Sequence, residues 1–150
     1  AFHHPYQAGP ADAFSASFRE RRRTAIEQRL EALAAAELPV LLAGAFRRYH
    51  GYQCHWVDWR ALDEALVRRA AHCIPFEHLA GTWERLLFDP ADNRRGFPDL
   101  VALGEVPGDY ALYEVKGPGD ALQEHQRRWL NHFADLGMPA SVLQVSWADG

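Results

Sequence analysis

The sequence predicts an α/β protein in which a helical N-terminal half precedes a small mixed β-sheet. Three observations predict this class. Apolar residues recur about every 3.6 residues over positions 15–88, as they do on the buried stripe of amphipathic helices. Two apolar runs, 100–103 and 110–116, flank Pro107-Gly108-Asp109, which is typical of a turn between strands. A further helical pattern then leads to a last apolar run at 140–146.

The N-terminal half is expected to be mostly helical. Residues 1–15 form an irregular lead-in without periodicity, and the helical part of the domain covers residues 16–92. Its apolar spacing predicts four helices: one at about 15–36, one at about 39–50, one that Asp58 caps and Ile74-Pro75 ends, and one at about 76–88. A polar loop then leads into the C-terminal core.

The C-terminal core, residues 93–150, contains the predicted strands. The turn residues between 100–103 and 110–116 make these two strands an expected hairpin. A helix at about 121–136 follows, and Gly137 ends it. Because a strand–helix–strand connection is right-handed and joins parallel strands, the last strand is expected to lie parallel to strand 110–116.

Three residues of this core carry the candidate chemistry: Asp99, Glu114 and Lys116. Side chains alternate along a strand, so Glu114 and Lys116 share one face and lie roughly 6.5–7 Å apart along it. Tyr113 and Val115 then point to the other face, toward a core or a covering helix. In the hairpin, Asp99 and Glu114 lie near its open end, so both carboxylates reach one point.

Two carboxylates that reach one point suit a hard divalent cation. Mg²⁺ and Mn²⁺ prefer carboxylate, carbonyl and water oxygens, so Asp99, Glu114 and the backbone carbonyl of Val115 are the predicted metal ligands. Such an ion activates a water and stabilises charge on a phosphate under attack. Lys116, the only lysine of the chain, is expected to assist the attacking water. The alternative for Glu114 and Lys116 is a solvated ion pair at the end of a strand.

The residues around these positions resemble the PD-(D/E)xK nuclease superfamily and, within it, the virus-type replication-repair nuclease (VRR-NUC) domain. The most similar pattern is that of the C-terminal nuclease region of the Fanconi-associated nuclease family: Arg-x-Gly-x-Pro-Asp-Leu-Val at 94–101, Glu-Val-Lys-Gly-Pro-x-Asp-x-Leu at 114–122 and Gln-x-x-Trp-Leu at 126–130. Arg-Arg-x-x-Ile-Glu-x-Arg-Leu at 22–30 extends the resemblance over most of the chain. It implies a restriction-endonuclease-like core, a mixed β-sheet flanked by helices.

The resemblance also implies an activity. The family is one of metal-dependent, structure-specific DNA phosphodiesterases of the phosphodiesterase I type, with 5′-flap endonuclease and 5′-to-3′ exonuclease action in DNA repair, including interstrand crosslink repair. The implied partners are flap or branched DNA and the upstream DNA-binding and helical domains of a longer chain. A further metal-binding carboxylate is expected from an upstream helix. Within this sequence Glu27 is the best substitute, with Glu31 behind it.

Four residues are candidates for DNA contacts. Arg94 and Arg95 stand beside Asp99 and are expected to bind phosphate. Arg22 belongs to a basic cluster at the start of a helix, which is either a phosphate clamp or a solvated face with ion pairs. Gln126, on the following helix, either orients a water or a phosphate or is an amide tied to the backbone.

Composition and charge restrict which classes of function and location remain for the protein. With a net charge of −4, DNA contacts have to come from locally clustered arginines. No apolar run approaches the roughly 18 residues of a membrane span, so none is predicted. Cys54 and Cys73 are expected to be reduced thiols of an intracellular protein, in the cytoplasm or nucleoid of a bacterium or the nucleus of a eukaryote. The alternatives to a nuclease are a non-catalytic DNA-binding or assembly module that keeps the fold and a metal-dependent hydrolase of small phosphoesters.

Overall fold

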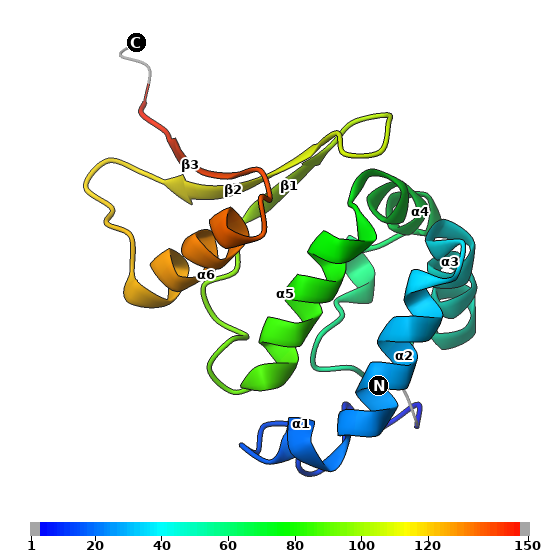
Figure 1. Cartoon of the computed structure of the whole chain (residues 1–150). Helices are drawn as coiled ribbons and strands as arrows, with labels where there is room; N and C mark the ends of the chain where they lie inside the picture. Colours follow the sequence, from blue (N-terminus) through cyan, green and yellow to red (C-terminus); the bar gives the residue numbers. More distant parts are fainter. Residues whose placement is uncertain (1–3, 148–150) are drawn as a thin grey trace.

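The computed structural model describes residues 4–147, in which a helical half is followed by a three-stranded sheet with one crossover helix (Figure 1). The elements run in the order α1 (Phe18–Arg21), α2 (Arg23–Ala34), α3 (Leu38–Tyr49), η1 (Trp59–Ala61), α4 (Glu64–Cys73), α5 (Phe76–Phe88), β1 (Leu100–Leu103), β2 (Tyr110–Lys116), α6 (Glu124–Asp135) and β3 (Ala140–Gln144). The predicted order of helices followed by β, β, α, β is confirmed. Over residues 4–147, every helix is too short or too polar to cross a membrane.

The first predicted helix, 15–36, is interrupted at Arg22 and forms α1 and α2 instead. Arg22 has backbone angles of φ −120° and ψ 12°, outside the helical range. Its guanidinium donates to both carboxylate oxygens of Asp12, at 2.7 and 2.9 Å. The N-terminal segment therefore folds back onto the break, a long-range contact that helical periodicity does not reveal.

Asp58 caps a different helix from the predicted one. Its side chain accepts from the Arg60 amide at 3.1 Å and starts the short 3₁₀ helix η1. The long helix α4 begins later, where the Asp63 side chain accepts from the Leu66 amide at 2.7 Å. The connector thus contains two capping aspartates, and the second one starts the long helix.

β2 is the central strand of the sheet, with β1 antiparallel on one side and β3 parallel on the other. Both pairings confirm the predictions from the hairpin turn and the crossover. α6 begins at Glu124 instead of at 121, because Gln123 and Gln126 form a capping box there. β3 ends at Gln144, before the predicted 146.

The main core lies between α6 and one face of the sheet (Figure 1). It contains the buried side chains of Cys73, Tyr110, Leu112, Trp129, Phe133 and Met138. A second core joins α2, α3, α4 and α5 around Leu33, Leu38 and Ala71. α5 connects the two, since its Leu79 and Trp83 pack on the second core while its Thr82 contacts Met138.

The charged side of β2 is the side that α6 covers. Glu114 is 2% exposed and Lys116 is 7% exposed, whereas Tyr113 and Val115 are only half-buried. The prediction that Tyr113 and Val115 face a core or a covering helix is therefore wrong. α6 packs on the face of Leu112, Glu114 and Lys116, and no helix of the described part of the chain covers the other face (Figure 1).

Candidate active site

A buried ion pair occupies the C-terminal end of β2. The Nζ atom of Lys116 lies 2.9 Å from Oε1 of Glu114, and both side chains are almost fully buried. Removing two charges from water is unfavourable unless they are paired and hydrogen-bonded. The predicted shared face of Glu114 and Lys116 is therefore confirmed, and the alternative of a solvated pair does not apply.

Gln126 is the second partner of Glu114. Its Nε2 atom donates to Oε1 of Glu114, and its Oε1 atom accepts from the Gln123 amide at 2.9 Å. One amide thus completes the N-terminal cap of α6 and holds the carboxylate of β2. The helix start and the charged strand end are fixed relative to each other by this side chain.

Asp99 lies immediately before β1 and docks on the same strand end. Its Oδ2 atom accepts from the Val115 amide at 2.8 Å. β1 pairs with β2 in a register of Leu100 with Tyr113, and extending it by one pair places Asp99 opposite Glu114 on the α6-covered face. The sheet therefore brings Asp99, Glu114 and Lys116 to one side, as predicted.

The donor set fits part of the shell of a hard cation. In a β-strand the N–H and C=O of one residue point toward the same neighbouring strand. Since the Val115 amide points to Asp99, the Val115 carbonyl is directed to that side as well. Two carboxylates and one carbonyl match the oxygen preference of Mg²⁺, which retains several waters when a protein binds it.

The further carboxylate of the sequence prediction does not join this set. Glu27 is exposed on α2, which lies on the far side of α5 from the sheet (Figure 1). Among residues 4–147, no three His, Cys, Asp or Glu side chains come close enough together to bind a metal ion. The structure therefore presents a two-carboxylate site and does not bring Glu27 to it.

The candidate DNA-binding arginines differ in how free their charges are. The Arg22 guanidinium forms a two-bond ion pair with Asp12 and lies 4.3 Å from the centre of the Phe18 ring. This pairing lowers the pKa of the Asp12 carboxyl. Arg94 and Arg95 are exposed in the segment that leads to Asp99. The Arg94 guanidinium lies 4.8 Å from the centre of the Phe14 ring.

Sequence reasoning missed the residues that hold the segment before Asp99. Trp129 donates through Nε1 to the backbone carbonyls of Asn93 and Arg95. Gly96 has a φ of +79°, a conformation that favours glycine. A signal for Trp129 was present in its spacing, because residues three apart on a helix share a face and Gln126 precedes it by three.

The comparison with protein families identifies the family of the chain. The model of the VRR-NUC domain matches residues 22–147. The chain belongs to the VRR-NUC domain family. The matched range contains Asp99, Glu114 and Lys116, so the whole two-carboxylate site of this VRR-NUC chain lies within it.

The relatives of this VRR-NUC chain have nuclease names. The chain is 40% identical over 147 residues to Fanconi-associated nuclease 1 homolog of Pseudomonas aeruginosa. This match covers 98% of the chain and 26% of that relative. It is 31% identical to Fanconi-associated nuclease 1 of Homo sapiens, over 96% of this chain and 15% of the relative. The VRR-NUC chain thus spans a small part of the length of the relatives it matches.

Solved structures give the same fold. A crystal structure of paFAN1 bound to 2-nucleotide 5′-flap DNA with a gap has a TM-score of 0.85 and 38% sequence identity, covering 98% of this chain and 27% of that one. A second paFAN1 structure, bound to 1-nucleotide 5′-flap DNA with a gap, has a TM-score of 0.85 over 97% of this chain. The mixed sheet with flanking helices is therefore the VRR-NUC fold, as the sequence predicted.

Proposed function

We propose that this VRR-NUC chain is the nuclease part of a metal-dependent, structure-specific DNA phosphodiesterase, with residues 93–150 as its catalytic core. The observation that carries the proposal is the buried pair of Glu114 and Lys116 beside Asp99. A buried ion pair adds little net stability compared with apolar side chains of similar volume. Its presence at the strand end where a second carboxylate docks is therefore best explained by chemistry.

Mg²⁺ or Mn²⁺ is the proposed cofactor, held by Asp99, Glu114 and the carbonyl of Val115. Lys116 and Gln126 both contact Oε1 of Glu114, so we assign Oε2 to the ion. When bound, such an ion lowers the pKa of a coordinated water and neutralises charge on the phosphate. Gln126 keeps the Glu114 carboxylate turned toward the site.

Lys116 has two proposed tasks. Its ammonium offsets the charge of Glu114 within the core, 2.9 Å away. Its other N–H groups orient the attacking water and stabilise the developing negative charge on the phosphate. In the reaction the water oxygen bonds to phosphorus and gives up a proton, one P–O ester bond breaks, and the leaving oxygen takes up a proton.

The proposed substrate is flap or branched DNA, cut by 5′-flap endonuclease and 5′-to-3′ exonuclease action inside the cell, in DNA repair that includes interstrand crosslinks. The relatives' names and the flap DNA bound by paFAN1 support this substrate class. Arg94 and Arg95 are the proposed phosphate contacts, because they are exposed in the segment that leads to Asp99. Arg22 contributes to DNA binding only if its pair with Asp12 opens.

One observation favours a second candidate function, a DNA-binding or assembly module without catalysis. Among residues 4–147 no third carboxylate joins Asp99 and Glu114, and two carboxylates with one carbonyl fill only part of the octahedral shell of Mg²⁺. The upstream domains of a longer chain, which we propose as partners of this one, are the expected source of the missing ligand.

Cleavage of flap DNA tests the proposal. With Mn²⁺ present, Asp99→Asn is expected to lower the rate at least about 100-fold, since a metal ligand is lost. Asp135→Asn, at the exposed end of α6, is the matched control and should cleave like the wild type. Equal rates for Asp99→Asn and wild type would remove the nuclease proposal, and DNA binding without any cleavage by the wild type would favour the module.

A further inference from the structure

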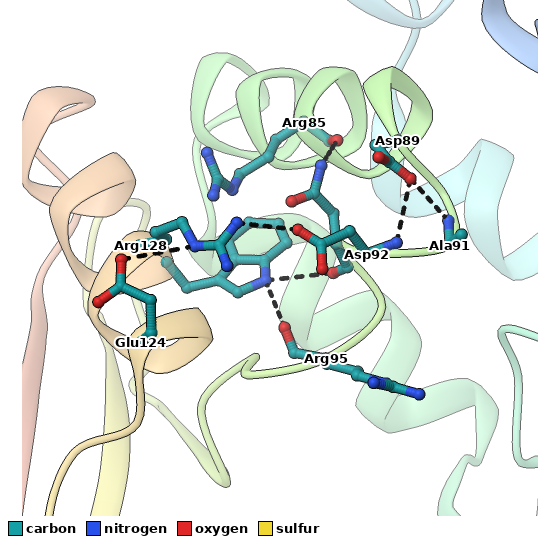
Figure 2. Close-up of polar contacts among 9 residues, drawn as sticks. Arg85, Asp89, Ala91, Asp92, Arg95, Glu124 and Arg128 are labelled. Atoms are coloured by element: carbon teal, nitrogen blue, oxygen red, sulfur yellow. Dashed lines mark hydrogen bonds and ion pairs between the residues drawn. The ribbon is translucent and has the colours of Figure 1, made fainter. Parts of the chain in front are cut away.

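The segment that follows α5 and leads to Asp99, residues 89–98 (the Asp99 segment), is held against α6 by an indole. The Nε1 atom of Trp129 donates to the carbonyl of Asn93 at 3.1 Å and to that of Arg95 at 3.0 Å (Figure 2). One N–H is shared between two carbonyls, so it fixes both peptide groups at once. This segment delivers Asp99, which follows Arg95 by four residues.

Further contacts support the same segment from both sides. Arg128 of α6 lies 2.9 Å from Asp92, and Asp89 caps the start of the segment by accepting from the Asp92 amide at 3.0 Å (Figure 2). The Asn93 side chain donates to the Arg85 carbonyl of α5 at 2.7 Å. The segment is therefore anchored to the end of one helix and to the face of another.

Gly96 is the point of closest approach to α6. A Cβ atom at this position would lie 2.6 Å from the backbone carbon of His125, and the positive φ of +79° also favours glycine. The chain therefore passes directly over the first turn of α6. No side chain fits between them.

The indole that makes these bonds has a fixed orientation. Trp129 is 1% exposed, and its ring stacks on Phe133 with a centroid distance of 5.2 Å. The Arg85 guanidinium lies 4.9 Å from the ring centroid, and burial together with the charge of Arg128 lowers the pKa of Arg85. Phe97 meets the ring edge-on at 5.1 Å. The N–H of Trp129 therefore points in one direction only.

The same helix holds the other carboxylate of the site. Gln126, three residues before Trp129, donates to Glu114. α6 thus contacts β2 through one side chain and the Asp99 segment through another, both on one face of the helix. The distance between the two carboxylates depends on this helix as a common reference.

We propose that Trp129 is a positioning residue, whose indole N–H sets the place of Asp99 relative to Glu114 and thereby the geometry of the metal site. The inference rests on the proposed metal-dependent function. It separates Trp129 from an ordinary core residue, because it predicts a defect at Asp99 when the N–H alone is removed and the aromatic packing is kept.

Trp129→Phe in the intact protein makes that change. Trp59→Phe is the matched control, since the Trp59 indole donates to the Tyr52 carbonyl at 2.7 Å in the helical half. The first readout needs no metal: amide hydrogen exchange of Val115, whose N–H binds Asp99. Displacement of Asp99 weakens its hydrogen bond to the Val115 amide, so exchange of this amide is expected to be faster by about fivefold or more in Trp129→Phe. Exchange of the same amide is expected to be unchanged in Trp59→Phe.

The second readout is the Mn²⁺ concentration at half-saturation, measured from free Mn²⁺ by electron paramagnetic resonance. Trp129→Phe is expected to raise this concentration about tenfold, because removing a contact that orients a metal ligand weakens metal binding by about this factor or more. Gly96→Ala, which pushes the segment off α6, is expected to give the same two changes. If Trp129→Phe does not fold, Gly96→Ala provides the test of the proposal instead.

Wild-type Val115 exchange and wild-type Mn²⁺ half-saturation in a folded Trp129→Phe or Gly96→Ala protein would overturn the proposal, even if cleavage fell. A defect of equal size in Trp59→Phe would do so as well, because it would indicate a general loss of stability. A failure of the nuclease proposal itself would be seen in a different experiment, as cleavage of flap DNA by Asp99→Asn at the wild-type rate. The two failures are therefore distinguishable.

Discussion

Each face of the β-sheet carries side chains that are unusual for its exposure. On the face that α6 covers, the charged residues Glu114 and Lys116 are 2% and 7% exposed. On the opposite face, the apolar side chains of Leu100 and Leu143 are 53% and 42% exposed. The register places these two leucines beside Tyr113 and Val115, away from the charged pair.

The difference identifies the face of the sheet on which we propose that the chemistry takes place. Burying apolar side chains stabilises a fold, and burying charges does not unless they are paired. The covered face gains its stability from Leu112 and from the aromatic residues of α6, and it places the ion pair at the strand end next to Asp99. The buried polar groups of this fold, rather than its exposed apolar side chains, therefore indicate where to look for a function.

The largest effect is expected from removing one partner of the buried pair. Lys116→Met leaves the Glu114 carboxylate in the core without its ammonium, which is expected to lower the free energy of unfolding by about 3–5 kcal/mol. Urea unfolding followed by tryptophan fluorescence measures it. Arg60→Met breaks an exposed pair of similar length, 2.8 Å to Asp58, and should leave the midpoint unchanged. Equal shifts in the two variants would contradict the contrast between covered and exposed charges.

A smaller effect is expected from matched apolar truncations on the two faces. Leu112→Ala, at 5% exposure on the covered face, should lower the free energy of unfolding by about 2–5 kcal/mol. Leu143→Ala, at 42% exposure on the other face, should lower it by about 1 kcal/mol or less. Thermal or urea unfolding compares them. Similar losses in both variants would mean that the second face is also covered in solution.

The smallest effect concerns the far end of the covered face, where Tyr110 donates to or accepts from His78 at 2.7 Å. Burial, with a further contribution from the charge of Glu77, raises the pKa of Tyr110 to about 12. Because the unfolded value is about 10, this contribution to stability is complete below pH 10 and is lost as the pH rises from about 10 to 12. Near-ultraviolet absorbance of the phenolate gives the folded pKa.

Tyr110→Phe is the control for that titration. It removes the ionisable group, so its unfolding free energy should depend less on pH over the same alkaline range. A phenolate that forms at the unfolded value in the native protein would show that Tyr110 is accessible to water and that the covered face is open at this end.

Local signals predicted the strands and the relation of the site residues along them. Strands β1 and β2 match the sequence prediction to the residue, because Pro107-Gly108-Asp109 marks the turn, Asp99 precedes the first apolar run and Lys116 ends the second. The shared side of Glu114 and Lys116 follows from strand alternation alone. These features depend on neighbours in the sequence.

Features that depend on distant residues were not predictable in the same way. Which face of β2 is covered depends on where α6 packs, so strand alternation does not reveal the environment of Tyr113 and Val115. The break at Arg22 depends on Asp12, ten residues earlier in the sequence. The bonds from Trp129 to the Asp99 segment join residues 34 and 36 positions apart, beyond the reach of periodicity.

The convergence of Asp99 and Glu114 on one cation is tested most directly by a crystal of the intact protein soaked in Mn²⁺, with the ion located by its anomalous scattering. The proposed site predicts a peak within about 2.5 Å of a carboxylate oxygen of Asp99, of Glu114 and of the Val115 carbonyl, as expected for direct coordination. Asp99→Asn crystals treated alike should show a weaker peak. A strong peak elsewhere, with none between these three groups, would contradict the assignment.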